Sequence, residues 1–374
     1  MASRNPTFPA RDGKAFHAEL KGEVDAYFKE RGLSTKGGLP MLAKTGVLLL
    51  MTFVPYGLIL TQAFPPVVMF LLAALVGIGM AGIGFAVAHD AIHGAYSDDN
   101  RINTLIGCSM DLIGGSCYMW KITHNVIHHT YTNIHGTDED LAVSPLLRLS
   151  PHAPRMWFQR FQHWYAFVLY GMTSMFWVFV KDFKYLAAKD LGPYEDKKHA
   201  FKDVAGLFAG KAVYYTWSLV IPFLILDYAW WQIALGMLTA HVVAGITLGI
   251  VFQLAHVVEQ TAHPVPDDAM AMPQSWVVHE LDTTANFAPT NVLLSWYVGG
   301  LNFQVEHHLF PKICSRHYPA LSPIVARLAA KHGLPYHVQP TFRSAVASHL
   351  RTLKAFGAGR SVTVPVPKEV LASA

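Results

Sequence analysis

The stretch PVVMFLLAALVGIGMAGIGFAVAHDAIH, residues 66–93, decides the class of fold. Residues 66–88 carry no charged side chain, and about 20 such apolar residues let a helix cross the hydrocarbon core of a membrane. The stretch ends with His89 and His93, whose four-residue spacing puts both imidazoles on one face of a helix. It therefore predicts a membrane helix that ends in two side chains able to bind one metal ion.

Three other apolar stretches approach the same length, at 42–62, 212–227 and 229–252. Only a few residues separate the members of each neighbouring pair, so the four stretches predict two tight hairpins. The hairpin turns carry almost no lysine or arginine, whereas the rest of the chain does, and the positive-inside rule makes that other side cytosolic. A composition of 52% hydrophobic and 14% charged residues, with a mean hydropathy of +0.28, also favours a membrane protein.

We therefore expect an all-α integral membrane protein with four transmembrane helices in two hairpins and a cytosolic helical cap. The whole chain, 1–374, is expected to be one membrane domain, divided into a cytosolic N-terminal helix in 1–40, a first hairpin in 42–88, a cytosolic and interfacial region in 89–211, a second hairpin in 212–252, and a cytosolic region in 253–374.

Three further segments outside the hairpins have a helical pattern. Residues 161–180 are apolar but bracketed by Arg160 and Lys181, which favours an interfacial helix. The two terminal segments predict amphipathic cytosolic helices from apolar residues at helical spacing, namely Phe16, Leu20, Val24 and Phe28, and then Phe342, Val346, Leu350 and Leu353.

Other classes of protein find little support in the sequence. The net charge is +4, and no block of basic residues with interleaved aromatics indicates nucleic-acid binding. Residues 77–82, GIGMAG, match a dinucleotide-binding pattern but lie inside a membrane stretch, with no preceding strand. We expect these glycines, like Gly245 and Gly249, to let helices approach closely.

Histidine clusters recur on the side predicted to be cytosolic. Residues 124–129, HNVIHH, repeat the four-residue spacing and add a third imidazole, His129, about 100° further round an α-helix. Residues 304–308, QVEHH, form another group, and His256 directly follows the last membrane stretch. A single histidine pair at a membrane interface is more often a hydrogen-bonded anchor. Eight imidazoles on one face exceed the ligands of one tetrahedral zinc site and predict two metal ions, although imidazole does not identify the element.

In these clusters the chain resembles the membrane fatty acid desaturases, and within them the front-end or linoleoyl-CoA desaturase-like branch. The resemblance extends from about Phe16 to His337. It is carried by three histidine boxes, made of His89, Asp90 and His93; of Trp120, His124, Asn125, His128, His129, Thr132, Asn133, Gly136 and Asp138; and of residues 299–311, which begin GGLNFQ.

The resemblance implies an enzyme that uses O2 and two electrons at a di-iron centre to insert a cis double bond into a fatty acyl chain, with delta-5- or delta-6-like regiochemistry. The acyl group can be carried by coenzyme A, a carrier protein or a lipid. The resemblance also implies the iron ligands, which are His89, His93, His124, His128, His129, His256, His307 and His308. Gln304 replaces the first histidine of other branches and is a further candidate for the metal sphere.

Three acidic residues stand beside the implied ligands and are candidates for orienting imidazole rings, namely Asp90, Asp138 and Glu306. Asp138 is equally well explained as a helix cap. Many front-end desaturases carry a fused haem domain with a His-Pro-Gly-Gly motif, to which residues 263–266, HPVP, are the nearest match. We therefore expect a separate electron donor, either ferredoxin or a cytochrome of the b type.

The length and the missing haem motif resemble bacterial members, which implies a bacterial inner membrane with the active site on the cytosolic face. Two other kinds of protein remain open. A hydroxylase, acetylenase or carotenoid-modifying oxygenase would keep the metal site and change the product, whereas a non-catalytic metal-binding membrane protein would bind metal without consuming O2. His241 lies too deep in a membrane stretch for the metal site, and we expect it to make a hydrogen bond between helices. His263 and His279 are spare ligand candidates.

Overall fold

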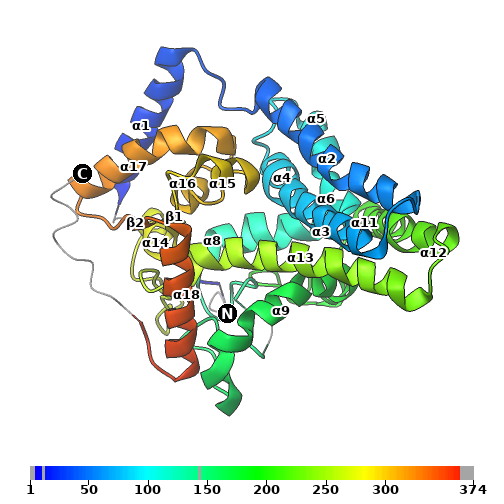
Figure 1. Cartoon of the computed structure of the whole chain (residues 1–374). Helices are drawn as coiled ribbons and strands as arrows, with labels where there is room; N and C mark the ends of the chain where they lie inside the picture. Colours follow the sequence, from blue (N-terminus) through cyan, green and yellow to red (C-terminus); the bar gives the residue numbers. More distant parts are fainter. Residues whose placement is uncertain (1–4, 11–12, 142–144, 363–374) are drawn as a thin grey trace.

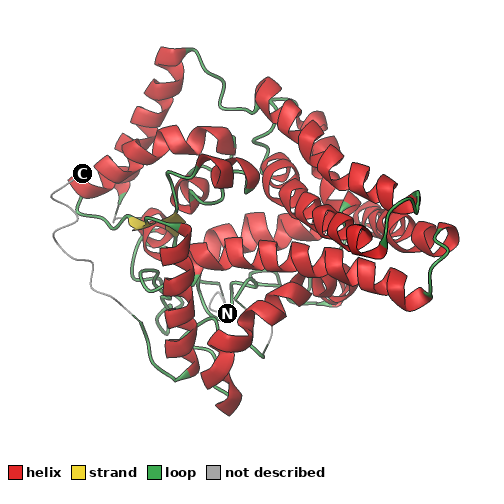
Figure 2. Ribbon diagram, viewed as in Figure 1, coloured by secondary structure: helices red, strands yellow, loops and turns green. Residues whose placement is uncertain are grey.

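The computed structural model describes residues 5–10, 13–141 and 145–362. The ends of the predicted regions 1–40 and 253–374, namely 1–4 and 363–374, therefore lie outside the described residues. Figure 2 shows that most of the described chain is helical, with loops between the helices and two short strands. The elements up to the second histidine box are α1 Lys14–Arg31, α2 Gly38–Leu60, α3 Pro66–Gly82, η1 Ile83–Ala88, α4 His89–Ile92, α5 Asn100–Gly107, α6 Ser109–Leu112, α7 Cys117–Trp120, η2 Lys121–His128 and α8 His129–Tyr131.

The middle of the chain forms η3 Trp157–Phe161, α9 Gln162–Phe176, η4 Trp177–Lys181, α10 Asp182–Ala187, α11 Phe201–Tyr215, η5 Thr216–Val220, α12 Ile221–Ile225 and α13 Trp230–His256. The last part forms α14 Trp276–Thr283, β1 Ala285–Phe287, α15 Val292–Tyr297, α16 Gln304–Leu309, η6 Ser315–His317, α17 Tyr318–Lys331, β2 His337–Gln339 and α18 Phe342–Gly357. Strands β1 and β2 pair in parallel.

Several of these elements join into continuous long helices. Among the described residues, five are long and apolar enough to cross a membrane, namely Gly38–Leu60, Pro66–Ile92, Trp157–Ala187, Phe201–Ile225 and Trp230–His256. Four of them overlap the predicted membrane stretches, with ends that differ by one or more residues. The fifth, Trp157–Ala187, contains the segment predicted to be interfacial.

The helix Phe201–Ile225 begins earlier than the apolar stretch at 212–227 indicated, because charged residues hid its first turns from hydropathy. One of these is Lys211, whose Nζ lies 2.6 Å from Oδ2 of Asp182, with both side chains buried. A buried lysine is tolerated when its charge is paired and its remaining protons are bonded, and Nζ also donates to the carbonyl oxygens of Gly114 and Val178.

Figure 1 shows α2 and α3 on one side of the molecule, α1, α17 and α18 on the other, and α13 running between them. Helix α13 packs against both α3 and α9, α2 packs against α3, and α1 packs against α17. The elements from α14 to α18 gather at the end of α13 that carries His256. The described chain is therefore mostly helical, with five helices able to cross a membrane and shorter elements gathered at one end of α13.

The glycines of the rejected dinucleotide motif sit at close helix contacts, as predicted. A Cβ on Gly77 would collide with the carbonyl group of Ala240, and one on Gly245 would lie 2.6 Å from the carbonyl oxygens of Tyr170 and Gly171. These contacts bring α13 close to α3 on one side and to α9 on the other.

The predicted amphipathic face of α1 is confirmed, because Phe16, Leu20, Val24 and Phe28 are all buried. The predicted helix is present as α18, but its stripe is confirmed only in part. Leu353 is buried, Val346 and Leu350 are half-buried, and Phe342 is exposed, whereas the buried face also holds Ala345, Ser348, His349, Thr352 and Phe356. The physical reason is a polar contact: Nε2 of His349 bonds the hydroxyl of Tyr170, and its Nδ1 bonds the carbonyl of Val257.

Candidate metal centre

The three histidine boxes lie on short helical segments, of which the first ends the long helix Pro66–Ile92. His89 begins α4, directly after the π-helical segment η1, and His307 and His308 lie on α16. The second box was expected on an α-helix, but residues from Lys121 to His128 form the π-helix η2. A π-helix bonds residue i to i+5 and is frequent at functional sites. It brings Nε2 of His124 to 3.3 Å from Nε2 of His129, a closeness that the α-helical spacing did not predict.

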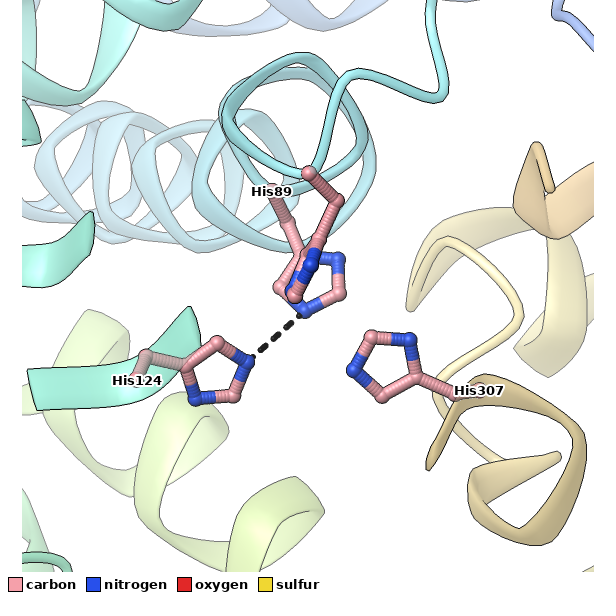
Figure 3. A group of neighbouring side chains, drawn as sticks. His89, His124 and His307 are labelled. Atoms are coloured by element: carbon pink, nitrogen blue, oxygen red, sulfur yellow. Dashed lines mark hydrogen bonds between the residues drawn. The ribbon is translucent and has the colours of Figure 1, made fainter. Parts of the chain in front are cut away.

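All eight predicted histidines are buried and meet in one cluster. The ligand atoms of each of three overlapping groups lie within 4.8 Å of one another, and the groups are His89, His93, His124 and His307; His128, His256 and His308; and His129, His307 and His308. Figure 3 shows His89, His124 and His307 converging from α4, η2 and α16, with Nε2 of His89 lying 3.2 Å from Nε2 of His124. Segments far apart in the sequence thus supply one site.

Four imidazoles have Nδ1 engaged by the protein and Nε2 without a partner. Nδ1 of His128 bonds Asp138 at 3.1 Å, and Nδ1 of His308 bonds Glu280 at 2.7 Å. Nδ1 of His256 and of His307 lies 3.3 Å from the carbonyl oxygen of Thr283 and from the hydroxyl of Tyr318, respectively. Metal-binding histidines usually have one ring nitrogen held in this way and the other on the metal. The cluster therefore fits a metal centre.

Electrostatics keep most of the cluster in the neutral form that binds metals. Burial, reinforced by the neighbouring imidazoles, holds the pKa of His93, His124 and His129 well below 6.5. His128 is different: burial lowers its pKa, but the carboxylates of Asp138 and Asp140 outweigh that effect and raise its pKa to about 9.

The three predicted acidic residues have different partners. Asp138 holds His128 and also accepts from the backbone N–H groups of Asn133 and Asp140. Asp90 accepts hydrogen bonds from the backbone N–H and hydroxyl of Ser315, so it ties the first box to the segment after the third. Glu306 accepts from Asn286 and Tyr336. Oδ1 of Asp90 also lies 3.7 Å from Nδ1 of His89, whereas the carboxylate of Glu306 bonds only to groups other than imidazoles among the described residues.

Sequence reasoning missed two carboxylates at the site. Glu280 lies on α14 and is fully buried, and it bonds both His308 and the hydroxyl of Thr132. Oδ2 of Asp140 lies 3.8 Å from Nδ1 of His124 and 3.7 Å from Nδ1 of His128. Glu280 follows His279 and stands two residues before Asp282, so no local pattern in the sequence marked it as buried at the site.

The remaining predicted residues lie near or outside the cluster. Gln304 begins α16 and is buried one turn before the histidine pair. His263 and His279 belong to none of the groups of close ligand atoms among the described residues, although His279 is buried and His263 is half-buried. His241 bonds Ser174 and Tyr214, which confirms the predicted hydrogen bond between helices.

A largely apolar cavity of about 610 Å³ opens beside the cluster, between α9 and α13. Its wall near the cluster is formed by His128, His256 and Trp120, and its lining also includes Lys181 and Lys184. The ring of Trp120 stacks on that of His124 at 4.6 Å. Small-molecule sites commonly have volumes of about 300–1,000 Å³, so this cavity can hold an extended apolar ligand next to the imidazoles.

Comparison with known proteins identifies relatives over most of the chain. The family model described as fatty acid desaturase matches residues 64–340. The sn-1 linoleoyl-lipid 6-desaturase of Arthrospira platensis is 36% identical over 91% of this chain and 92% of its own length. A protein of the same name from Synechocystis sp. is 36% identical over 92% of this chain and 96% of its own length. The acyl-lipid (8-3)-desaturase of Physcomitrium patens is 31% identical over 92% of this chain and 72% of its own length.

Proposed function

The chain belongs to the fatty acid desaturase family, and from this premise we propose that it is a front-end desaturase with delta-6-like regiochemistry that acts on the acyl chain of a membrane glycerolipid. The names of the relatives from Arthrospira platensis and Synechocystis sp. place their reaction at position 6 of a linoleoyl lipid. Family membership makes this chain an oxidoreductase of acyl lipids.

The observation that carries the proposal is the cluster of eight buried imidazoles that forms one wall of an apolar cavity. We propose that the cluster holds two iron ions, one among His89, His93, His124 and His307 and the other among His128, His129, His256 and His308, with Gln304 at the edge of the metal sphere. When bound, a redox-active iron pair supplies the oxidation that zinc cannot supply. Asp138 and Glu280 orient His128 and His308.

The overall reaction sets what else the site needs. Loss of two hydrogens from neighbouring methylenes, with O2 reduced to two waters, consumes two further electrons and two protons. A separate donor, ferredoxin or a cytochrome of the b type, is the proposed electron source. A double bond counted from the carboxyl end requires the polar end of the substrate at a fixed distance from the metals, and Lys181 and Lys184 place polar groups in the cavity lining.

The chain is proposed to cross the membrane four times. His128 and His256 share one group of close ligand atoms, so the chain between them must return to the same membrane face. Three candidate spans lie in this interval, and only an even number of them can cross. The non-crossing helix is proposed to be Trp157–Ala187, because Gln162 near its start bonds the carbonyl of Leu353 on α18, and Lys181 near its end bonds Asp140.

The face that carries the site is proposed to be the cytosolic face of a bacterial inner membrane. Each hairpin then leaves from the side of the cluster and returns to it. Basic residues such as Arg148 and Arg316 lie in the segments on this side, in agreement with the positive-inside rule.

The test is to express the chain in a host that lacks this double bond, supply linoleate, and identify lipid fatty acids by gas chromatography with mass spectrometry. A new double bond on the carboxyl side of the existing ones is expected with the wild type and with His17→Ala, a control at an exposed histidine. It should be absent with His128→Ala and His308→Ala. A hydroxylated or acetylenic product would overturn the reaction, and a double bond on the methyl side would overturn the regiochemistry.

A further inference from the structure

A second apolar cavity, of about 220 Å³, lies toward the N-terminal end of α13, away from the imidazole cluster. Its walls come from α2, α3, α11, α13 and the segments around α12, and they include Met80, Trp217 and Met237. His241 and Tyr214 also line this cavity. The first cavity, beside the metal centre, is lined by α13 residues from Leu248 to Val257, so the two cavities use successive parts of one helix.

Three polar side chains meet where the cavities approach each other. Nδ1 of His241 lies 2.9 Å from the hydroxyl oxygen of Ser174, and Nε2 of His241 lies 2.9 Å from the hydroxyl oxygen of Tyr214. All three side chains are buried, with exposed fractions of 0% for His241, 4% for Ser174 and 1% for Tyr214. Both ring nitrogens are used, so the imidazole is fixed between α9 and α11.

The position of Ser174 places this triad between the two spaces. Its neighbours Thr173 and Trp177 on α9 and η4 line the first cavity, whereas its bonded partner His241 lines the second. Leu248, the α13 residue nearest to His241 among those that line the first cavity, follows it by seven residues, or about 10 Å of helix. Along α13 the two cavities are thus separated by about two helical turns, and the Ser174–His241–Tyr214 triad lies in this separation.

We propose that the Ser174–His241–Tyr214 triad is a partition that ends the acyl cavity and limits the length of the methyl end that the enzyme accepts. This inference rests on the proposed function, because it requires that the first cavity holds the substrate chain. The second cavity is then the space into which a longer chain extends when the partition is opened.

The polar character of the partition gives it rigidity that an apolar side chain would lack. A leucine or methionine at the end of an apolar cavity can change rotamer to admit one more methylene. Moving the His241 ring would instead leave the buried hydroxyl groups of Ser174 and Tyr214 without partners in an apolar environment, which is costly. The length limit is therefore expected to be sharp.

The test uses acyl substrates that share the carboxyl-side pattern and differ only in the length of the methyl end. Product is measured for competing pairs with the full-length enzyme in membranes. His241→Ala should open the partition and raise the ratio of longer to shorter product by about tenfold, the discrimination that one methylene gives in an apolar pocket. Thr173→Leu, which fills the first cavity beside the partition, should shift the ratio toward shorter chains by a similar factor.

Thr239→Ala is the matched control, because its hydroxyl lies on the same helix and bonds the carbonyl of Leu235 in its own helix. The control should keep the wild-type length profile. An unchanged profile in His241→Ala with product still formed would overturn the partition. If His241→Ala does not accumulate as folded protein, an unchanged profile in Thr173→Leu overturns it equally. Absence of product from the wild type would overturn the proposed function, and this inference with it.

Discussion

Oε2 of Glu280 lies 2.7 Å from Nδ1 of His308, and both side chains are fully buried. The same carboxylate accepts a hydrogen bond from the hydroxyl of Thr132, so one acidic residue of α14 joins the second and third histidine boxes. Neither spacing nor composition places Glu280 at the metal centre. It is nevertheless the closest carboxylate partner of any of the eight imidazoles among the described residues.

Replacing Glu280 should weaken iron binding without removing a ligand. Glu280→Ala leaves Nδ1 of His308 without its acceptor, so the ring loses its fixed orientation and we expect about 10–100-fold lower iron affinity. The measurement is iron per chain by mass spectrometry after equilibration against a competing chelator.

Glu306→Gln is the matched control for this variant, because Glu306 is also buried but bonds Asn286 and Tyr336. It should keep its iron under the same chelator. Equal iron retention in wild type and Glu280→Ala would show that Glu280 does not position His308.

Close helix packing at Gly245 should make even a methyl group destabilising. Gly245→Ala places a Cβ against the carbonyl oxygens of Tyr170 and Gly171, and overpacking of this kind costs about 1–3 kcal/mol. Gly236→Ala on the same helix is the control, because a Cβ there meets no atom within 4 Å and alanine is the better helix former. Thermal unfolding in detergent should give a lower Tm for the first variant and an equal or higher Tm for the second. The reverse order would contradict the packing of α13 on α9.

The buried pair of Lys211 and Asp182 should behave as a unit. Lys211→Met leaves the Asp182 carboxylate buried without its cation, which typically costs about 3–5 kcal/mol. Adding Asp182→Asn removes the stranded charge and should restore part of the stability, since the amide oxygen can still accept from Nε1 of Trp177. A double-mutant cycle of Tm values measures this coupling. Additive losses would mean that the two charges do not interact.

The carboxyl group of Asp111, which lies outside the long helices, should make the free energy of unfolding depend on pH. Burial raises the pKa of Asp111 from 3.8 to about 7. Between about pH 4 and pH 7 the folded chain therefore holds a proton that the unfolded chain has released, so the free energy of unfolding falls as pH rises. Asp111→Asn removes this cost, and its amide oxygen can still accept from the backbone N–H of Cys117.

The check is the difference in Tm between Asp111→Asn and wild type, measured at two pH values. The variant should gain stability relative to wild type at about pH 8 and show little gain at about pH 5. A constant difference across this range would contradict the raised pKa.

Much of the fold and site was predictable from local patterns. The membrane stretches follow from hydropathy. Four-residue spacing pairs His89 with His93 and His124 with His128, whereas the full set of eight histidines was implied by the resemblance to the desaturases. What failed depends on contacts between segments. The helix that contains Lys211 was predicted to begin too late, because a charged residue lowers the mean hydropathy even when a buried partner such as Asp182 neutralises its charge. The buried face of α18 was misassigned because polar His349 lies inside it, with both ring nitrogens bonded.

Two features of the site had no readable local signal. The π-helical turn at η2, which brings His124 near His129, differs from an α-helix by one residue per hydrogen bond and has no distinct pattern of apolar residues. Of the three acidic residues predicted to orient imidazoles, Asp138 bonds His128 and Asp90 lies 3.7 Å from His89, whereas Glu306 bonds Asn286 and Tyr336. Glu280 bonds His308 from another helix, and proximity along the chain did not indicate it.

We propose that the eight-histidine cluster holds an iron pair that desaturates acyl lipids. The most direct test is to measure iron per chain and desaturated product on the same purified, membrane-reconstituted protein, supplied with a linoleoyl lipid, O2 and an electron-donor system. We expect two irons per chain. The amount of product should rise in proportion to the iron content and should disappear when iron is removed. Full activity with one iron per chain, or with iron removed, would contradict this proposal.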